Sequence, residues 1–271
     1  MTAAAELHRI MGRLARHDGR VTIVTGASSG LGRGIATRFA QEGSAVVVAD
    51  LQREPKAVEK FEQESELPTD EYIESALEGE ATFIETDVTR PDEVMALIRK
   101  TVDEYGRLDV LVNNAGIYIP GDSQSMTVEE WQQVIDVNLN APFYTSKFAA
   151  THLERSEGCI VNIASVHATE GGSGPAYSSS KAGVLNLTRD LAVEFGPDIR
   201  VNAILPSFSK TSILNFADEE YLADALDHIP MNRFGDPADI GDAAVFLASE
   251  EASFIQGAAL PVDGGWSTHR N

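Results

Sequence analysis

A single cysteine, Cys159, is present in 271 residues, so no disulfide bond can form within one chain. No apolar run approaches the roughly 20 residues that a membrane-spanning helix needs, and the first residues lack the apolar centre of a secretory signal. We therefore expect a cytoplasmic protein without a membrane segment. Cys159 lies in the apolar run 159–161, which indicates a small buried hydrophobe. No group of Cys and His residues has the spacing of metal ligands, so no metal is expected.

Basic residues are also scarce. The chain has 21 Lys and Arg, of which only six are Lys, against 42 Asp and Glu, and its formal net charge is −21. Nucleic-acid binding needs a basic surface, so we expect no nucleic-acid partner. Ten acids and three bases fall in residues 53–80. The remaining excess is spread along the chain, as in proteins of salt-rich cytoplasms, although an ordinary acidic protein would show the same composition.

Short apolar segments alternate with amphipathic ones along most of the chain. Buried strands are expected at Val21–Thr25, Ala45–Ala49, Ala81–Thr86, Val110–Asn113, Cys159–Ala164, Arg200–Ile204 and Ala258–Val262. Helices are expected near 31–42, 91–105, 127–154, 176–195 and 237–249. Strands separated by helices imply right-handed crossovers, so the expected fold is α/β: a Rossmann-like, doubly wound parallel sheet of about seven strands with helices on both faces.

No linker or internal repeat divides this pattern, so residues 20–271 are expected to form one domain that binds the dinucleotide and carries the catalytic residues. Residues 1–19 precede it as an extension. Apolar residues at helical spacing (Leu7, Ile10, Met11 and Leu14) predict that this extension is helical. The acidic segment 53–80 is expected to be mostly helical and to face solvent.

The first predicted strand leads into a turn, 26–32, with the spacing Gly-x-x-x-Gly-x-Gly, and then into a helix. Glycines at such a turn let the backbone approach a pyrophosphate, and the helix N-terminus supplies N–H groups and a positive dipole end. We therefore expect a dinucleotide to be bound by Gly26, Ser28, Ser29, Gly30, Leu31 and Gly32.

Asp50 ends the second predicted strand, 24 residues after Gly26. An acid about 20 residues beyond the glycine turn can bind the adenosine ribose hydroxyls. Its charge would repel a 2′-phosphate, so the expected cofactor is NAD rather than NADP. Arg33 and Arg53 leave this preference open, because either could reach a phosphate.

Ser165 follows the fifth predicted strand, and Tyr177 and Lys181 follow at the start of a helix. Tyr and Lys at i and i+4 share one helical face. For Tyr to act as a base near neutrality its pKa must fall by roughly 3, equivalent to about 4 kcal/mol. A positive charge ~4 Å away supplies about that much at an effective dielectric constant near 20.

With these motifs in this order, the sequence resembles the short-chain dehydrogenase/reductase family over nearly all of residues 20–266. The resemblance implies a catalytic group of Asn138, Ser165, Tyr177 and Lys181. Tyr177 would exchange the proton of the alcohol, Ser165 would polarise the same oxygen, Lys181 would lower the pKa of Tyr177 and bind the nicotinamide ribose, and Asn138 would hold a proton-relay water. It also implies cofactor contacts from Asp87, Val88, Asn114, Ala115, Gly116, Tyr177, Lys181, Pro206 and Thr211. Ser207 departs from the family, which usually has Gly there, and this makes the path of the loop uncertain.

The implied activity is hydride transfer between NAD(H) and a secondary alcohol or its ketone. Polar residues in the loops above the nicotinamide favour a sugar, polyol or small hydroxy acid as substrate. The substrate residues we expect are Tyr118, His167, Glu170 and Ser207. Alternatives are a 3-oxoacyl thioester reductase, which the acidic composition and Asp50 disfavour, and a non-catalytic NAD-binding protein. The resemblance further implies a homotetramer associating through the helices at 127–154 and 176–195.

Overall fold

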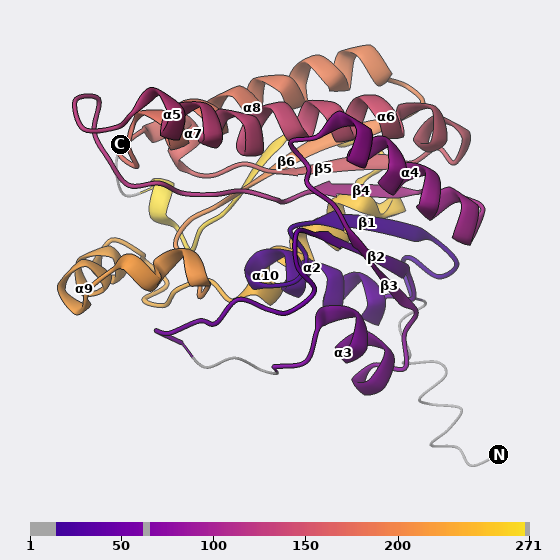
Figure 1. The fold of residues 1–271 in the computed structure, drawn as a ribbon, viewed down its shortest axis with the longest axis horizontal. Coiled ribbons are helices and arrows are strands. Elements are labelled where there is room, and N and C mark those ends of the chain that lie inside the picture. The colour runs from indigo at the N-terminus through magenta and orange to yellow at the C-terminus, as the bar shows by residue number, and fades with distance from the viewer. Residues whose placement is uncertain (1–14, 62–65, 269–271) are drawn as a thin grey trace.

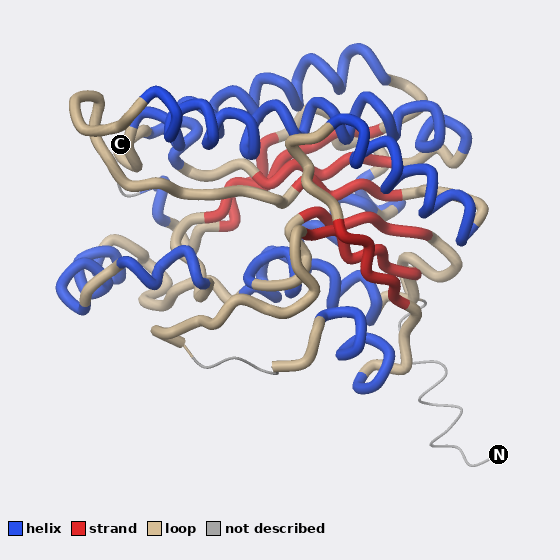
Figure 2. Tube along the Cα trace, viewed as in Figure 1, coloured by secondary structure: helices blue, strands red, loops and turns tan. Residues whose placement is uncertain are grey.

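A seven-stranded sheet lies at the centre of the computed structural model, which describes residues 15–61 and 66–268 (Figures 1 and 2). All strand pairs are parallel, and the order is β3-β2-β1-β4-β5-β6-β7. The strands are β1 (Val21–Thr25), β2 (Ala45–Asp50), β3 (Ala81–Glu85), β4 (Val110–Asn113), β5 (Cys159–Ile163), β6 (Arg200–Pro206) and β7 (Ala259–Val262). The order reverses between β1 and β4, and this switch point is where such sheets bind ligands.

Helices cover both faces of this sheet (Figure 1). The longer ones are α2 (Gly30–Gln41), α3 (Thr69–Ala76), α4 (Pro91–Tyr105), α5 (Val128–Ile135), α6 (Ala141–Arg155), α8 (Pro175–Phe195), α9 (Glu219–Asp227) and α10 (Pro237–Ala248). Short helical segments are η1 (Asp136–Asn140), α7 (His167–Glu170), η2 (Ser212–Phe216), η3 (Glu250–Ala252) and η4 (Trp266–Thr268). The expected Rossmann-like α/β fold is therefore confirmed.

The two faces follow from the alternation of side chains along each strand. In β1, Val24 packs in one cluster with residues of α2 and α10, such as Phe39 and Ile240. Its neighbour Ile23 packs in a second cluster with residues of α4 and α6, such as Leu97. Cys159 in β5 is buried, as expected, and burial raises the pKa of its thiol to about 11.

Two expected helices differ from the observed ones. The helix expected at 127–154 contains a π-helical turn, η1, in which Ala141 N–H donates to the carbonyl of Asp136. Among the described residues of the segment 53–80, helix is found in α3, whereas residues 53–61 form no regular element. Pro55 explains part of this, because proline lacks the N–H that a helix interior requires.

The helical extension expected at 1–19 falls mostly outside the described residues. Residues 16–19 form turns, and His17 packs edge-on against Phe39 with ring centroids 4.8 Å apart. Its Nε2 lies 3.0 Å from the carbonyl oxygen of Val245 in α10, and burial lowers the pKa of His17 to about 4. A neutral His17 therefore attaches the chain before β1 to α2 and α10 at neutral pH.

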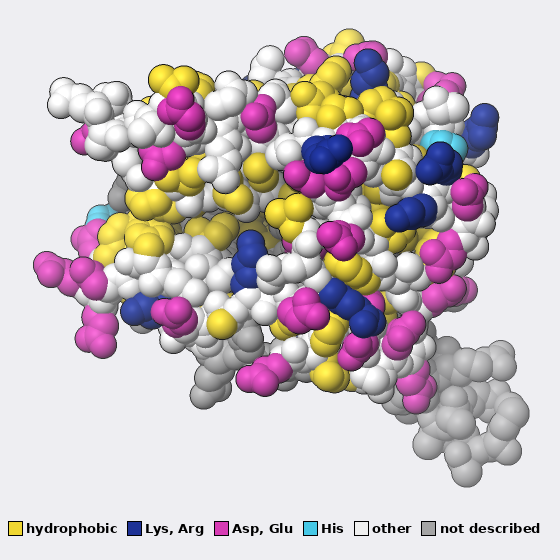
Figure 3. All heavy atoms as spheres, in the orientation of Figure 1, with side chains coloured by type: hydrophobic (Ala, Val, Ile, Leu, Met, Phe, Trp, Pro, Cys, Tyr) yellow, Lys and Arg dark blue, Asp and Glu magenta, His cyan; other side chains and the backbone are white. Residues whose placement is uncertain are grey.

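Acidic side chains are distributed over the face shown in Figure 3, with few basic ones among them. We expect the melting temperature to be higher in about 1 M KCl than in about 0.1 M KCl, because the Debye length falls from about 10 Å to about 3 Å and repulsion within the folded state is relieved. Each kcal/mol gained would raise the melting temperature by about 2–4 °C. Differential scanning calorimetry checks this. A sucrose solution of equal osmolality is the control for general exclusion effects. An unchanged or lower melting temperature in KCl would contradict the expectation.

Candidate active site

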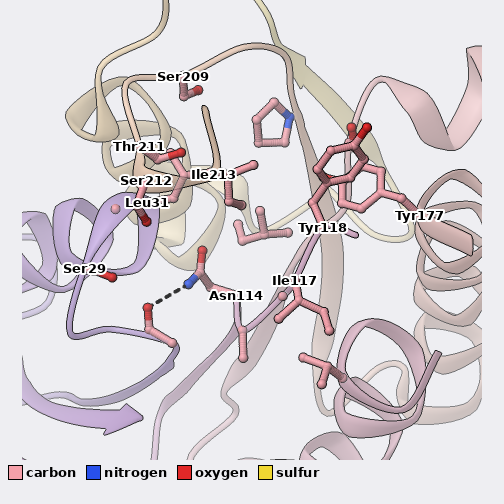
Figure 4. Close-up of a pocket in the computed structure, with 18 of the residues that line it drawn as sticks. Ser29, Leu31, Asn114, Ile117, Tyr118, Tyr177, Ser209, Thr211, Ser212 and Ile213 are labelled. Carbon is pink, nitrogen blue, oxygen red and sulfur yellow. Dashed lines mark hydrogen bonds between the residues drawn. The ribbon is translucent and has the colours of Figure 1, made fainter. Parts of the chain in front are cut away.

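A pocket runs along the carboxyl ends of the strands, with walls contributed by the loops that follow β1 to β6 (Figure 4). Most of the residues expected to bind cofactor or substrate line it: Gly26, Ser29, Gly30, Leu31, Asp50, Asp87, Val88, Asn114, Ala115, Gly116, Tyr118, Ser165, His167, Tyr177, Lys181, Pro206, Ser207 and Thr211. Four expected residues, Ser28, Gly32, Asn138 and Glu170, lie outside its wall. In the described part of the chain, no group of His, Cys, Asp and Glu is arranged to hold a metal ion.

The glycine turn is held in place by close backbone approaches. Gly26 has φ +65°, and a Cβ on it would lie 2.9 Å from the Cα of Ala115. A Cβ on Gly32 would lie 2.1 Å from the carbonyl oxygen of Gly26, which places Gly32 behind the turn rather than in the pocket wall. Both positions exclude any larger residue without movement of the backbone.

The start of α2 has the properties of an anion site. Ser29 at the N-cap makes no capping hydrogen bond with its side chain, and the first turn contains no acidic residue. The N–H groups of that turn are therefore not satisfied by a cap, and the positive end of the helix dipole faces the pocket beside Ser29 and Gly30. These residues fit the pyrophosphate of a dinucleotide.

Asn114 connects the end of β4 to this turn. Its Nδ2 donates to the carbonyl of Thr25 at 2.8 Å, and the Oγ1 of Thr25 accepts from the N–H groups of Asn114 and Ala115, each at 3.0 Å. Behind it, Asn113 Nδ2 donates to Asn162 Oδ1 at 2.8 Å in the buried interior. The sequence did not single out Thr25 or Asn162, because a polar residue inside an apolar strand reveals its partner only when the strands are paired.

Asp50 lies in the pocket wall, and its carboxylate accepts from the N–H groups of Ser28 at 3.0 Å and Leu51 at 2.8 Å. The two arginines that left the cofactor preference open both have partners in the protein. Arg53 forms ion pairs with Asp70 at 2.7 Å and Glu71 at 3.0 Å.

The other arginine, Arg33, donates to the carbonyl of Leu67 at 2.6 Å and stacks over Tyr72 at 5.2 Å from the ring centroid. Ser28 lies behind this part of the site, where its Oγ donates to the carbonyl of Gln52 at 2.6 Å.

Ser165, Tyr177 and Lys181 meet at the opposite end of the pocket. Burial raises the pKa of Tyr177, and a hydrogen bond with Ser165 counteracts this. Lys181 Nζ donates to the carbonyl of Ile163 at 2.8 Å and lies 5.8 Å from the centroid of the Tyr177 ring. A positive charge near the phenol favours its ionised form, which opposes the effect of burial. Burial also lowers the pKa of Lys181 to about 8, so its charge is largely retained at neutral pH.

Asn138 is fully buried in η1 and braces the loop after β4. Its Oδ1 accepts from the N–H of Ile117 at 2.9 Å, and its Nδ2 donates to the carbonyl of Ile117 at 3.0 Å and to Ser180 Oγ at 3.1 Å. A Cβ on Gly116 would lie 3.4 Å from Asn138 Oδ1 and 3.5 Å from Lys181 Nζ. Gly116 therefore lies directly beside both side chains.

At the substrate end, Tyr118 packs edge-on against Tyr177 with centroids 5.5 Å apart, and both rings lie on the same side of the pocket in Figure 4. His167 Nδ1 lies 2.6 Å from the carbonyl oxygen of Gly171, so this nitrogen carries the proton. Ser207 Oγ donates to the carbonyl of Asp263 at 2.8 Å, which fixes the loop in the absence of the usual glycine.

Glu170, expected beside the substrate, is placed elsewhere by the structure: its carboxylate accepts from Trp266 Nε1 at 3.0 Å. Aromatic rings pack together around this end instead. Phe208 packs against Trp266 at 4.9 Å, and Phe216 packs against Tyr118 at 5.3 Å. These contacts join residues far apart in the chain, so no local pattern could reveal them.

The switch-point pocket, the uncapped glycine turn and the Ser, Tyr and Lys side chains at one end define a nicotinamide-dependent oxidoreductase. A family model described as enoyl-(acyl carrier protein) reductase matches residues 26–267. The chain belongs to the short-chain dehydrogenase/reductase family and acts on CH–OH groups.

Known relatives cover nearly the whole chain. Meso-2,3-butanediol dehydrogenase of Serratia marcescens is 37% identical over 252 residues, 92% of this chain and 95% of the relative. The 3-oxoacyl-(acyl-carrier-protein) reductase of Thermotoga maritima is 36% identical over 253 residues, 92% and 98% of the two chains. A solved structure of a proposed 2-deoxy-d-gluconate 3-dehydrogenase from Agrobacterium tumefaciens, with bound NADP, has a TM-score of 0.81 and 36% identity, covering 94% of this chain and 99% of that one.

No helix within the described residues is both long and apolar enough to cross a membrane.

Proposed function

We propose that this protein is an NAD(H)-dependent dehydrogenase of a small polyhydroxylated substrate: a sugar, a polyol or a small hydroxy acid. The observation that carries the proposal is the placement of Ser165, Tyr177 and Lys181 together in the pocket wall, with Lys181 Nζ 5.8 Å from the centroid of the Tyr177 ring. A phenol held this way can take the proton of an alcohol or return it to a ketone.

In this proposal each side chain has a separate task. Tyr177 exchanges the proton, Ser165 hydrogen-bonds the same substrate oxygen, and Lys181 favours the phenolate by its charge. Asn138 is a positioning residue, because its amide holds the backbone of Ile117 beside the pocket. A bound nicotinamide supplies or accepts the hydride.

NAD is the proposed cofactor because Asp50 places a carboxylate in the pocket wall, and Arg53 and Arg33, the two arginines that could have reached a 2′-phosphate, have partners in the protein. A substrate rich in hydroxyl groups is proposed because His167, Ser207 and Tyr118 bring polar atoms to the wall near Tyr177. One relative is named for meso-2,3-butanediol and another for 2-deoxy-d-gluconate, and both compounds carry more than one hydroxyl group.

A homotetramer associating through α5–α6 and α8 is also part of the proposal. The support within the chain is apolar area left exposed on these helices. Trp131 of α5 is 37% exposed and Phe143 of α6 is 43% exposed.

The substrate class is tested by a panel of aldoses, sugar acids, polyols, secondary alcohols and an acetoacetyl thioester, assayed with NAD(H). We expect the highest kcat/KM with a polyhydroxylated compound, and His167→Phe should raise its KM roughly tenfold or more, because a polar partner of the substrate in the pocket wall is lost. Glu220→Gln, a change on the exposed surface of α9, is the matched control. A higher kcat/KM for the thioester, with His167→Phe neutral, would favour the acyl-thioester reductase instead.

A further inference from the structure

The segment that follows β2 departs from the sheet and runs toward the substrate end of the pocket, where η2 and α9 lie (Figure 1). We name residues 53–61 the strap. Its first residue is anchored on the adenosine side, where Arg53 pairs with Asp70 in α3. Within it, Lys56 lines the pocket together with Asp50 and Leu51. The strap therefore borders the space that the dinucleotide fills.

The far end of the strap is attached to the loop that follows β6. Asn215 in η2 binds the strap backbone at two points: its Oδ1 accepts from Glu59 N–H at 3.0 Å, and its Nδ2 donates to the carbonyl of Ala57 at 3.1 Å. Phe61 packs edge-on against Phe234 at 5.8 Å and joins the apolar cluster that contains Trp266.

The strap and the η2 loop thus border the pocket on two sides, and they are joined to each other through Asn215. Residues 211–214 and Phe216, on either side of Asn215, also line the pocket, as does Tyr118, against which Phe216 packs. A dinucleotide between β1 and β4 would have the strap on one side and the η2 loop on the other. A dinucleotide that leaves on this side would pass their junction.

We propose that the contact between Asn215 and the strap is a latch that retains the dinucleotide and holds the η2 loop over it. Asn215 is a positioning residue in this role, and the idea rests on the proposal that the pocket binds NAD(H). An amide is needed, because a single side chain must both donate to Ala57 and accept from Glu59. Asp has the same shape but lacks the donor, and its charge would face the Ala57 carbonyl.

The test is stopped-flow measurement of dinucleotide dissociation from Asn215→Asp, Asn215→Ala and Phe61→Ala, with Glu220→Gln as the control. NADH fluorescence is followed, or NADPH fluorescence if the wild-type protein binds that form more tightly. We expect dissociation roughly tenfold faster in both Asn215 variants, as the loss of two neutral hydrogen bonds implies. The single-turnover rate of the hydride step at saturating cofactor should stay within about threefold, since no reacting group is touched.

Melting temperatures identify variants whose faster dissociation results from lower stability. Asn215→Asp is the decisive variant for the latch, because Asp has the same shape as Asn. A wild-type dissociation rate in Asn215→Asp and Phe61→Ala would overturn the latch. The dissociation measurement needs no substrate, so the latch is tested separately from the substrate class. Tighter binding of NADPH than of NADH by the wild-type protein would refute the proposed cofactor while leaving the latch to be judged by its own result.

Discussion

Tyr177→Phe should lower kcat for alcohol oxidation by about 10²–10⁴-fold, the usual contribution of a positioned acid–base group. The substitution removes one hydroxyl from a ring that also packs against Tyr118. The fold and the affinity for NAD⁺ should therefore remain close to wild type. Steady-state kinetics and a dinucleotide titration measure the two effects separately.

Tyr72→Phe is the matched control, because it makes the same chemical change on a ring in α3 that lies outside the pocket wall. It should leave kcat within a few-fold of wild type. The pH profile gives a second readout: burial raises the pKa of Tyr177, and the phenolate is the base, so wild-type oxidation should accelerate as the pH rises. More than about a tenth of wild-type turnover in Tyr177→Phe would overturn the role proposed for Tyr177.

The wild-type protein should prefer NAD⁺ over NADP⁺ by about two to three orders of magnitude in kcat/KM. The reason is the Asp50 carboxylate: like charges ~4 Å apart repel by about 4 kcal/mol at an effective dielectric constant near 20. Asp50→Asn removes the charge and keeps one acceptor oxygen for the N–H groups of Ser28 and Leu51. We expect this variant to narrow the preference at least tenfold, mainly through better use of NADP⁺.

Glu85→Gln is the control for a general change of charge, because Glu85 pairs with Asp50 in the sheet register but is exposed and lies outside the pocket wall. It should leave the preference unchanged. Equal kcat/KM for the two cofactors in the wild-type protein would refute the role of Asp50. The comparison of NAD⁺ with NADP⁺ matters in this family, because a related structure contains NADP.

The sheet could be predicted because its strands are short apolar runs. Parallel strands that helices cover on both faces are apolar along nearly their whole length. The first strand was predicted with its observed ends, Val21–Thr25, whereas β6 continues two residues beyond its expected end to Pro206. The glycine turn could also be predicted, because Gly26 and Gly32 stand at positions where the fold leaves no room for a side chain.

The parts that could not be predicted depend on contacts between distant residues. Glu170 looked like a substrate ligand because it follows β5 in a loop, but its partner, Trp266, lies 96 positions away. The strap looked helical from its composition, and its true course is set by Asn215, more than 150 positions further along the chain. Propensity acts within a few residues, so it gives no information about such partners.

The π-helical turn η1 puts α5 and α6 out of phase. An α-helix turns by about 100° per residue, so one extra residue in a single turn rotates everything before it by that angle relative to everything after it. Val134 in α5 and Thr145 in α6 are buried on either side of this offset, and the buried Asn138 lies within it. A one-codon deletion in η1 would therefore act unlike any substitution there, since it would turn the whole of α5 about its axis relative to α6.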